Sequence, residues 1–259
     1  MKATDIFNDE KFIKCLKKWT FDEKGNRIKI FNRKGEIIEE NVDKVIKIDC
    51  SDYWITSIEG ISIFKNLKKL YLSINKIEKL PKEIWNLKKL EELFLNNNKI
   101  NELSSEIGKL KKLKILDLSN NQIKKLPEEI WNLKKLEILK LSYNKIKEIP
   151  KEIWKLKNLE ILNLDWNQLQ WLSIKVLGFN KLQQIWLYYA FDLNNLKQDS
   201  KNLLDILKKL KDNNVFDDFD LYYLKTKVYP VLAEKIKEKY KITDLKNFKD
   251  NFNLDNLTF

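Results

Sequence analysis

Side chains that could carry out acid–base or nucleophilic chemistry are scarce in this sequence. It contains no histidine, the commonest general base and metal ligand in proteins. Acidic pairs such as Glu128/Glu129 and Asp217/Asp218 are chain neighbours, so their carboxylates point in different directions and indicate solvated surface. The sequence has no glycine-rich phosphate loop and no GxSxG nucleophile motif. We therefore predict a non-enzymatic protein without catalytic, cofactor-binding or metal-binding residues.

Two cysteines, Cys15 and Cys50, are the remaining candidates for covalent chemistry. They lie 35 residues apart and match neither a CxxC motif nor a zinc-binding spacing. Two thiols in 259 residues favour a reducing compartment over a disulfide framework. Cys15 falls on an expected apolar helix, where we predict a buried, inert thiol. Because no apolar run resembles a signal peptide or a membrane span, we expect a cytoplasmic protein, with export by a dedicated secretion system as the alternative.

Aromatic side chains at a regular spacing are better suited to recognition. Tyr143, Trp166 and Tyr189 follow one another at intervals of 23 residues. Large rings with a polar tip are favoured at binding hot spots, because they bury much area at a small cost in side-chain entropy. These rings can lie side by side only if the chain itself repeats with the same period.

The sequence does repeat every 23 residues. Residues 80–100 and 126–146 share sixteen of 21 letters. A shift of 23 residues aligns whole columns of aliphatic residues. The first column holds Leu67, Leu90, Leu113, Leu136, Leu159 and Leu182. The next two hold Leu70, Leu93, Leu116, Leu139, Leu162 and Ile185, then Leu72, Leu95, Leu118, Leu141, Leu164 and Leu187.

The pattern LxxLxLxxNxI followed by xxLPxEIWxL resembles the leucine-rich repeat, in particular the 23-residue type of intracellular and bacterial proteins. The match covers residues 67–189. The resemblance implies an α/β solenoid with a parallel β-sheet on its concave face and short helices or 3₁₀ turns on its convex face. The physics agrees, because the alternation Leu-x-Leu has the period of a strand and stacked units bury each other's leucines. Pro81, Pro127 and Pro150 would each start a return segment through the letters EIW.

One asparagine follows the strand leucines in each of five units. The column holds Asn75, Asn98, Asn121, Asn144 and Asn167, which we call the asparagine ladder. Where each strand turns, backbone groups would be left unpaired inside the coil, and a stacked amide can both donate and accept a hydrogen bond there. We therefore predict a structural role for the ladder and no contact with a ligand.

Both ends of a solenoid need covers, because an open end exposes its core. We divide the chain into an N-terminal cap over residues 1–44, repeats over residues 45–189 and a C-terminal helical cap over residues 190–259. The N-terminal cap is predicted to contain an amphipathic helix over residues 1–18, followed by hairpins that turn at Gly25 and Gly35. Residues 45–53 read as a degenerate first unit with Ile46 and Ile48 in the two strand-leucine places. About three helices are expected over residues 196–241.

The concave face is where the two similar stretches differ. Four of their five differences, at residues 92/138, 94/140, 96/142 and 97/143, lie between or just after the strand leucines, whereas exposed lysines on the back are unchanged. Selection for binding would rewrite the front and keep the scaffold, although recent duplication and chance would produce the same result. The predicted partner-binding residues on this face are Tyr143, Trp166, Ile138, Ile161, Lys140, Asp165, Trp186, Tyr188 and Tyr189.

Two sets of aromatic residues allow a structural interpretation as well. Trp186, Tyr188 and Tyr189 would be covered if the C-terminal helices packed on them, which makes Tyr143 and Trp166 the stronger candidates for a partner contact. A second series on the back is predicted to wedge between neighbouring turns, with an oligomer contact as the alternative. It comprises Trp85, Trp131 and Trp154.

The net charge of +12 raises the possibility of a polyanion partner. Residues 67–189 hold 24 basic and 14 acidic side chains, and the basic excess lies on the return segments and the back as scattered lysine pairs. Arginine occurs only at Arg27 and Arg33. We therefore expect an unidentified protein or peptide partner, no specific nucleic-acid ligand and a monomer. The alternatives are polyanion or nucleic-acid binding by the lysine-rich convex face, and an effector whose C-terminal helical region is active.

Overall fold

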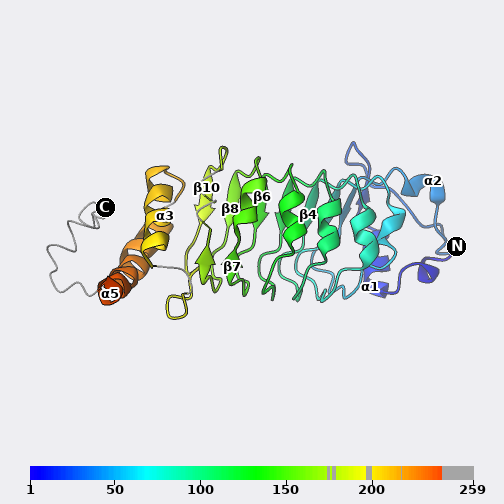
Figure 1. Cartoon of the computed structure of the whole chain (residues 1–259). Coiled ribbons are helices and arrows are strands. Elements are labelled where there is room, and N and C mark those ends of the chain that lie inside the picture. Colours follow the sequence, from blue (N-terminus) through cyan, green and yellow to red (C-terminus); the bar gives the residue numbers. More distant parts are fainter. Residues whose placement is uncertain (174–175, 177–178, 197–199, 217, 241–259) are drawn as a thin grey trace.

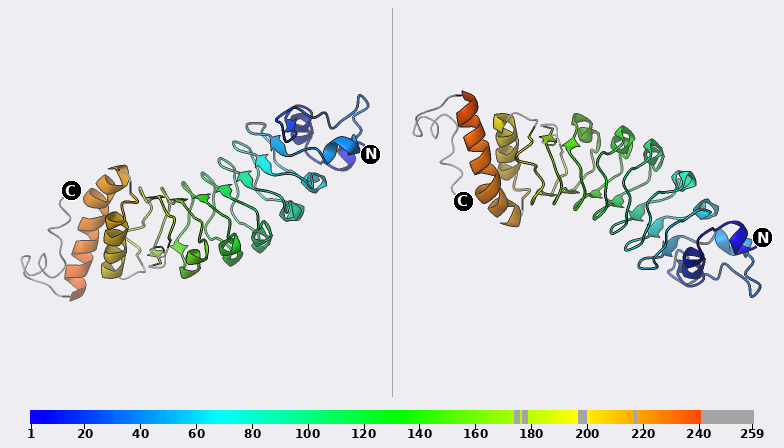
Figure 2. Two further views of the ribbon diagram at one scale, coloured as in Figure 1. Left: turned by 90° about the horizontal axis from the view of Figure 1, so that it is seen from above. Right: turned by 90° about the horizontal axis from the view of Figure 1, so that it is seen from below.

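The protein is a curved solenoid with a different cover at each end (Figures 1 and 2). The structure is a computed structural model and describes residues 1–173, 176, 179–196, 200–216 and 218–240. Figure 2 shows the coils stacked along an arc, with the strands on its inner side and the short turns on its outer side. The predicted leucine-rich-repeat architecture is confirmed.

One sheet of eight strands forms the concave face, in the order β1-β2-β3-β4-β5-β6-β8-β10. Only β1 (Thr20–Phe21) is antiparallel to its neighbour, and the other described strands pair in parallel. These are β2 (Lys47–Asp49), β3 (Lys69–Tyr71), β4 (Glu92–Phe94), β5 (Ile115–Asp117), β6 (Ile138–Lys140), β8 (Ile161–Asn163) and β10 (Gln184–Trp186). From β3 to β10 each pairing joins residues 23 apart, so the leucine columns stack in register. All twelve residues of the second and third columns are fully buried.

The convex face consists of short 3₁₀ turns, as predicted. They are η2 (Ile61–Ile63), η3 (Lys82–Asn86), η4 (Ser105–Lys109), η5 (Glu128–Asn132) and η6 (Lys151–Lys155). Pro81, Pro127 and Pro150 each stand directly before a turn in an extended conformation. A second sheet of two short parallel strands, β7 (Glu148–Ile149) and β9 (Trp171–Leu172), lies on the return segments.

The asparagine ladder makes the hydrogen bonds that its predicted structural role requires. The Asn121 Oδ1 accepts from the Ile100 N–H at 2.9 Å, and its Nδ2 donates to the carbonyls of Leu95 and Leu118, each at 3.0 Å. Asn98, Asn144 and Asn167 make the same three hydrogen bonds from their own coils. Each amide therefore joins two coils.

The predicted helix over residues 1–18 is wrong in its first half. The chain begins with a 3₁₀ turn, η1 (Ala3–Asp5), and the helix α1 spans Glu10–Leu16. The helix begins there because the Asp9 Oδ1 accepts from the backbone N–H groups of Lys11 and Phe12, as an N-cap does. The predicted tight turns at Gly25 and Gly35 are present, with φ of 82° and 78°, but only single bridges flank them. A one-turn helix, α2 (Glu39–Val42), follows.

The predicted register of the first unit is also wrong, by two residues. Strand β2 pairs with β3 so that Ile48 stands opposite Leu70, where Ile46 was expected. A shift of two residues leaves every side chain on the same face, so the alternation of the sequence did not distinguish the two registers. Cys50 follows Ile48 by two residues and so takes the second leucine place, and it is fully buried.

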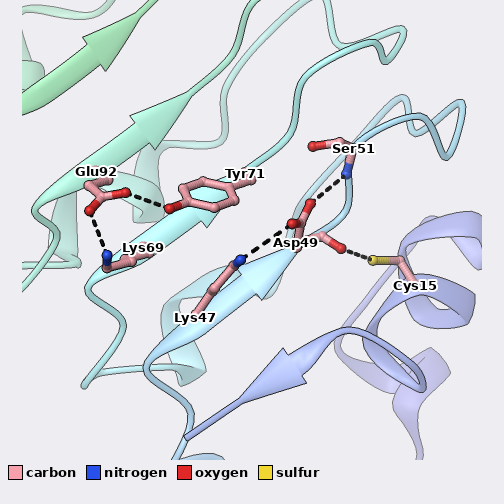
Figure 3. Close-up of polar contacts among 7 residues, drawn as sticks. All are labelled: Cys15, Lys47, Asp49, Ser51, Lys69, Tyr71 and Glu92. Atoms are coloured by element: carbon pink, nitrogen blue, oxygen red, sulfur yellow. Dashed lines mark hydrogen bonds and ion pairs between the residues drawn. The ribbon is translucent and has the colours of Figure 1, made fainter. Parts of the chain in front are cut away.

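This register brings Cys50 against α1, where it forms a disulfide with Cys15 across a Cα–Cα distance of 5.6 Å. The prediction of an inert thiol at Cys15 is therefore wrong, although the residue is buried as expected. The Cys15 sulfur also lies 3.4 Å from the Asp49 carbonyl oxygen (Figure 3), a contact without a proton because the sulfur is oxidised. The bond removes the thiols on which the expectation of a reducing compartment rested. The cytoplasmic location stays a prediction.

Helices cover the C-terminal end of the sheet. They are α3 (Ser200–Asp212), α4 (Asp218–Tyr223) and α5 (Tyr229–Tyr240), and a π-helical segment, Leu224–Val228, joins the last two. Two N–H groups on the open side of the last repeat find partners in this unit. Ile185 donates to the Val215 carbonyl at 2.9 Å, and Leu187 donates to the Asp220 carboxylate at 2.7 Å. Residues 241–259 of the predicted C-terminal unit lie outside the described part of the chain.

The tryptophan series on the convex side divides into two groups. Trp85 and Trp131 are buried, as predicted, whereas Trp154 is 41% exposed and lies against the Lys157 ammonium, 4.5 Å from the ring centroid. Gly108 has the same place in η4, where an added Cβ would lie 2.9 Å from the Glu129 carbonyl oxygen. The glycine therefore permits the close approach of η4 to η5.

Candidate functional site

A column of residues with left-handed backbone conformation runs along the edge of the concave sheet. From Ile74 to Trp166, each member directly precedes an asparagine of the ladder. The backbone angle φ of every member is between 50° and 59°. The members are Asp52, Ile74, Asn97, Asn120, Tyr143, Trp166 and Tyr189, which we call the left-handed column. From Ile74 to Trp166, each N–H donates to a carbonyl of the next coil at 2.8–2.9 Å. The stacking of the coils therefore fixes this conformation at every level.

Three consecutive members of the column form a stack of aromatic rings. The ring centroids of Tyr143 and Trp166 lie 5.4 Å apart with an interplanar angle of 11°, and those of Trp166 and Tyr189 lie 4.5 Å apart at 19°. The three side chains are 53%, 41% and 40% exposed. We call them the aromatic ridge. Because the ring faces cover each other, the ridge presents ring edges, two phenol groups and an indole to solvent.

The residue types in the column are unusual for their backbone conformation. Asparagine and aspartate tolerate positive φ, whereas bulky and β-branched residues in this region are strained by about 1–3 kcal/mol. Asp52, Asn97 and Asn120 are thus the inexpensive choices. Ile74 and the aromatic ridge are the costly ones, and Ile74 is 54% exposed. Burial does not explain why the costly residues are present.

The remaining residues predicted for partner binding lie beside the ridge. Ile138 and Ile161 are half-buried and stand opposite each other on β6 and β8. Lys140 is half-buried two pairs further along the same strands, opposite Asn163. Asp165 directly precedes Trp166, and its carboxylate accepts from the Tyr188 N–H at 2.8 Å. The structure therefore brings these residues onto one face, next to Tyr143 and Trp166.

The C-terminal helices touch the ridge without covering it. Tyr223 of α4 is buried, and its ring centroid lies 4.9 Å from that of Tyr189 and 5.3 Å from that of Tyr188. Burial, and then the neighbouring Tyr189 phenol, raise the pKa of Tyr223 to about 12. Trp186 and Tyr188 are half-buried and Tyr189 is exposed. The alternative of burial beneath the C-terminal unit thus applies in part to Tyr188 and Trp186, and leaves Tyr143 and Trp166 open to solvent.

The N-terminal half of the concave face has a different character (Figure 3). Lys69 pairs with the Glu92 carboxylate at 2.7 Å, and the Tyr71 hydroxyl donates to the same carboxylate. Lys47 pairs with Asp49 at 3.5 Å and lies 4.6 Å from the centroid of the Tyr71 ring. Charged groups here are therefore matched within the protein.

The pKa values in this network reflect the matching. Burial opposes ionisation of Glu92, but hydrogen bonds from Lys69 and Tyr71 outweigh it, so the pKa of the carboxyl is lowered. Burial, and next the bond to ionised Glu92, raise the pKa of Tyr71 above its usual range. Both groups thus keep their ordinary charge states near neutral pH. The network stabilises the surface and offers no unmatched charge to a partner.

Sequence reasoning placed the aromatic ridge but missed two features. It did not identify the backbone conformation of the left-handed column, although Asn97 and Asn120 at equivalent places were a signal for positive φ. It also missed the network of Tyr71, Glu92 and Lys69. Other residue types stand at the equivalent places of the other units, so no column of the repeat indicates this network.

The repeated coil with an inner parallel sheet and an asparagine at five successive turns defines a leucine-rich-repeat solenoid. The chain belongs to the leucine-rich repeat family. A family model described as "Leucine-rich repeat region" matches residues 104–256, and a second, "Leucine rich repeat", matches residues 45–100 and 65–123. The comparison with curated proteins finds no match.

Solved structures of the same fold come from bacteria and plants. A leucine-rich repeat protein of Leptospira interrogans is 32% identical, with a TM-score of 0.50, over 64% of this chain and 47% of its own. The ectodomain of a membrane receptor kinase of Arabidopsis thaliana is 32% identical, with a TM-score of 0.52, over 58% of this chain and 19% of its own. An internalin of Listeria monocytogenes, inlF, is 20% identical, with a TM-score of 0.50, over 71% and 63%. This chain thus spans less than two thirds of the length of each of these three solved chains.

Within the part of the chain that the structure describes, no helix has the length and apolar character needed to cross a bilayer.

Proposed function

We propose that this chain is a non-enzymatic binding module that holds a protein or peptide on its concave face, centred on Tyr143 and Trp166. Leucine-rich repeats commonly mediate protein–protein interaction, and their curved sheets offer an extended binding surface. One similar structure, the Arabidopsis ectodomain, is in complex with CASPARIAN STRIP INTEGRITY FACTOR 2. The face and the residues are our assignment.

The observation that carries this proposal is the strained, exposed aromatic ridge. A protein core does not need these rings, because they are 40–53% exposed. The backbone disfavours them, because φ is 50–53° at all three. Strain of this kind is found at functional sites, and stacked rings on a rigid sheet form a preorganised hot spot. A binding role accounts for both the exposure and the cost.

The test is capture of a partner by wild type and by two tryptophan variants. We expect Trp166→Ala to keep the circular dichroism spectrum of the wild type and to lose the proteins captured from a lysate of the source cells, identified by mass spectrometry. Trp154→Ala is the matched control, because Trp154 has the same 41% exposure but lies on the convex side. Capture that survives Trp166→Ala, or that depends on Trp154, would remove the concave site.

A further inference from the structure

The left-handed column combines three chemical features along one line, and together they specify a kind of partner. Beyond Asp52, the column continues with Ile74, then Asn97 and Asn120, and ends with the aromatic ridge. Neighbouring coils are about 4.8 Å apart, so the line from Ile74 to Tyr189 spans about 24 Å. An extended polypeptide advances about 3.3 Å per residue, so about seven residues would cover it.

The two amides in the middle are arranged to bind a peptide backbone. The Asn120 Nδ2 donates to the Asn97 Oδ1, and this bond orients both amides along the line. Within the described residues, no other side-chain hydrogen bond is made by either amide. The Asn97 Nδ2 and the Asn120 Oδ1 are therefore available as one donor and one acceptor, which is the pair that a peptide unit requires.

Exposed lysines lie on the segments that leave the ladder, and two of them, Lys145 and Lys147, follow Tyr143 by two and four residues. Lys124 and Lys125 follow Asn121, and Lys145 and Lys147 follow Asn144; we call these four exposed residues the lysine rim. Among the described residues, none of their ammonium groups makes an ion pair or a hydrogen bond. The acidic residue on these two segments is the exposed Glu148. Residues 122–126 and 145–149 thus carry four lysines against one acidic residue.

The two lysines that take the place of Lys145 in the N-terminal coils have partners. Lys76 lies 4.2 Å from the centroid of the Trp54 ring, and Lys99 pairs with Glu78 at 3.7 Å. The two concave carboxylates near the ridge are occupied as well. Asp117 accepts from the Ser119 N–H at 2.9 Å, and Asp165 accepts from Tyr188. The four rim lysines thus outnumber the three acidic residues near them, Asp117, Glu148 and Asp165.

We propose that the occupant of this line is an extended, acidic peptide segment with an apolar or aromatic side chain that packs on the ridge. Carboxylates of the segment pair with the lysine rim, and its backbone bonds to Asn97 and Asn120. This inference rests on the proposed function and adds the chemistry of the partner. A charge-complementary rim also speeds the encounter of the two molecules and makes it sensitive to salt.

The test is selection from a display library of random 12-residue peptides on the immobilised wild-type chain, with subtraction on Trp166→Asn. We expect the enriched peptides to carry more Asp and Glu than the starting library and at least one aromatic or large aliphatic residue. Neutral or basic peptides that depend on Trp166 would overturn the acidic occupant and leave the proposed function intact. Absence of any enrichment over Trp166→Asn would overturn the peptide occupant, while the lysate experiment decides the proposed function independently.

A charge-reversal series on the best selected peptide tests the rim directly. We expect Lys145→Glu/Lys147→Glu to raise its Kd tenfold or more in low salt, and the difference to shrink in high salt. Lys112→Glu/Lys135→Glu is the matched control with the same net charge, because both lysines are exposed and precede the strands at the opposite edge of the sheet. Equal weakening by the two pairs would show a general attraction to the positively charged chain and would overturn the rim.

Discussion

At the scale of the single residue, the left-handed column contains residues that its backbone conformation favours and residues that it disfavours. One backbone conformation recurs in seven coils, so the side chains at this place can be compared with the geometry held constant. Three coils carry Asp or Asn, which the conformation favours, and four carry bulky residues, which it disfavours. The bulky residues are also exposed. Residue preference thus argues against them. The rings stack on one another and Tyr189 contacts Tyr223, and beyond these contacts we propose recognition of a partner as the reason for the bulky residues.

Exchanging the residue types of two neighbouring coils tests the strain. We expect Ile74→Asn to increase the free energy of unfolding by about 1 kcal/mol, because a β-branched residue leaves a left-handed position. The reverse change one coil away, Asn97→Ile, should decrease it by a similar amount. Urea denaturation measures both. A loss of stability in Ile74→Asn would show that the isoleucine side chain contributes more by packing than the backbone loses by strain.

Each asparagine of the ladder directly follows a residue of the left-handed column, and we expect its replacement to destabilise the protein. Asn121→Ala removes an amide that serves the Ile100 N–H and the carbonyls of Leu95 and Leu118. All three groups are buried, so we expect a loss of about 3 kcal/mol in the free energy of unfolding. Lys124→Ala, three residues further on and exposed, serves as the control and should change stability by less than about 0.5 kcal/mol. Similar values for the two variants would contradict a structural role of the ladder.

At the scale of the element, the carboxylate of Asp9 joins the N-terminal helix α1 to the first repeat by hydrogen bonds. The Asp9 Oδ1 caps the helix, and its Oδ2 accepts from the Thr56 N–H at 2.7 Å, the Thr56 hydroxyl at 2.8 Å and the Ser57 N–H at 3.1 Å. Burial raises the pKa of this carboxyl, but the hydrogen bonds outweigh burial and lower it below the usual value of 3.8.

A lowered pKa fixes the sign of the pH dependence at this junction. The stability that ionised Asp9 contributes is present above pH 3.8 and is lost as the pH falls through the lower folded-state pKa. We therefore expect Asp9→Asn to be less stable than wild type near neutral pH, by about 1–2 kcal/mol, and the difference to shrink below about pH 4. Urea denaturation of both proteins across this range measures it. A difference independent of pH would contradict the assignment.

The disulfide fixes the same helix covalently. The bond between Cys15 and Cys50 closes a loop of 35 residues, and loop closure of this size contributes about 4 kcal/mol in the chain-entropy account. We expect a reductant to lower the melting temperature of wild type and to leave Cys15→Ser/Cys50→Ser unchanged. Because both cysteines are buried, the reductant must be added during refolding. Identical melting with and without reductant in the wild type would contradict the bond.

At the scale of the whole molecule, the repeated part was predictable and the unrepeated ends were less so. Between Leu67 and Leu187 each unit tests the alignment of the others, so the strands, the 3₁₀ turns and the exposed Tyr143 and Trp166 followed from columns. Residues 1–66 occur once. There the start of α1 depended on the N-cap Asp9. Two registers of β2, shifted by two residues, both place the apolar residues toward the core, so the sequence pattern did not distinguish them. The disulfide followed from that register, so the sequence did not reveal it.

The two ends of the molecule also divide the concave surface. The N-terminal half pairs its own charges through Lys69, Glu92 and Tyr71, and the C-terminal half exposes the aromatic ridge beside unpaired lysines. The coils have the same backbone in both halves, so the difference lies in the side chains alone. One continuous scaffold therefore carries a closed surface and an open one, and we assign binding to the open one.

The free energy of unfolding of Trp166→Asn, measured by urea denaturation beside wild type, tests the central claim most directly. If Trp166 is retained for recognition at a cost in backbone strain, the relief of strain offsets the lost ring stacking, and the variant should be as stable as wild type or more so. A loss of 2 kcal/mol or more, on the order of what a packed aromatic side chain contributes, would show that the ring holds the fold together, and the account of the ridge as a binding site would be wrong.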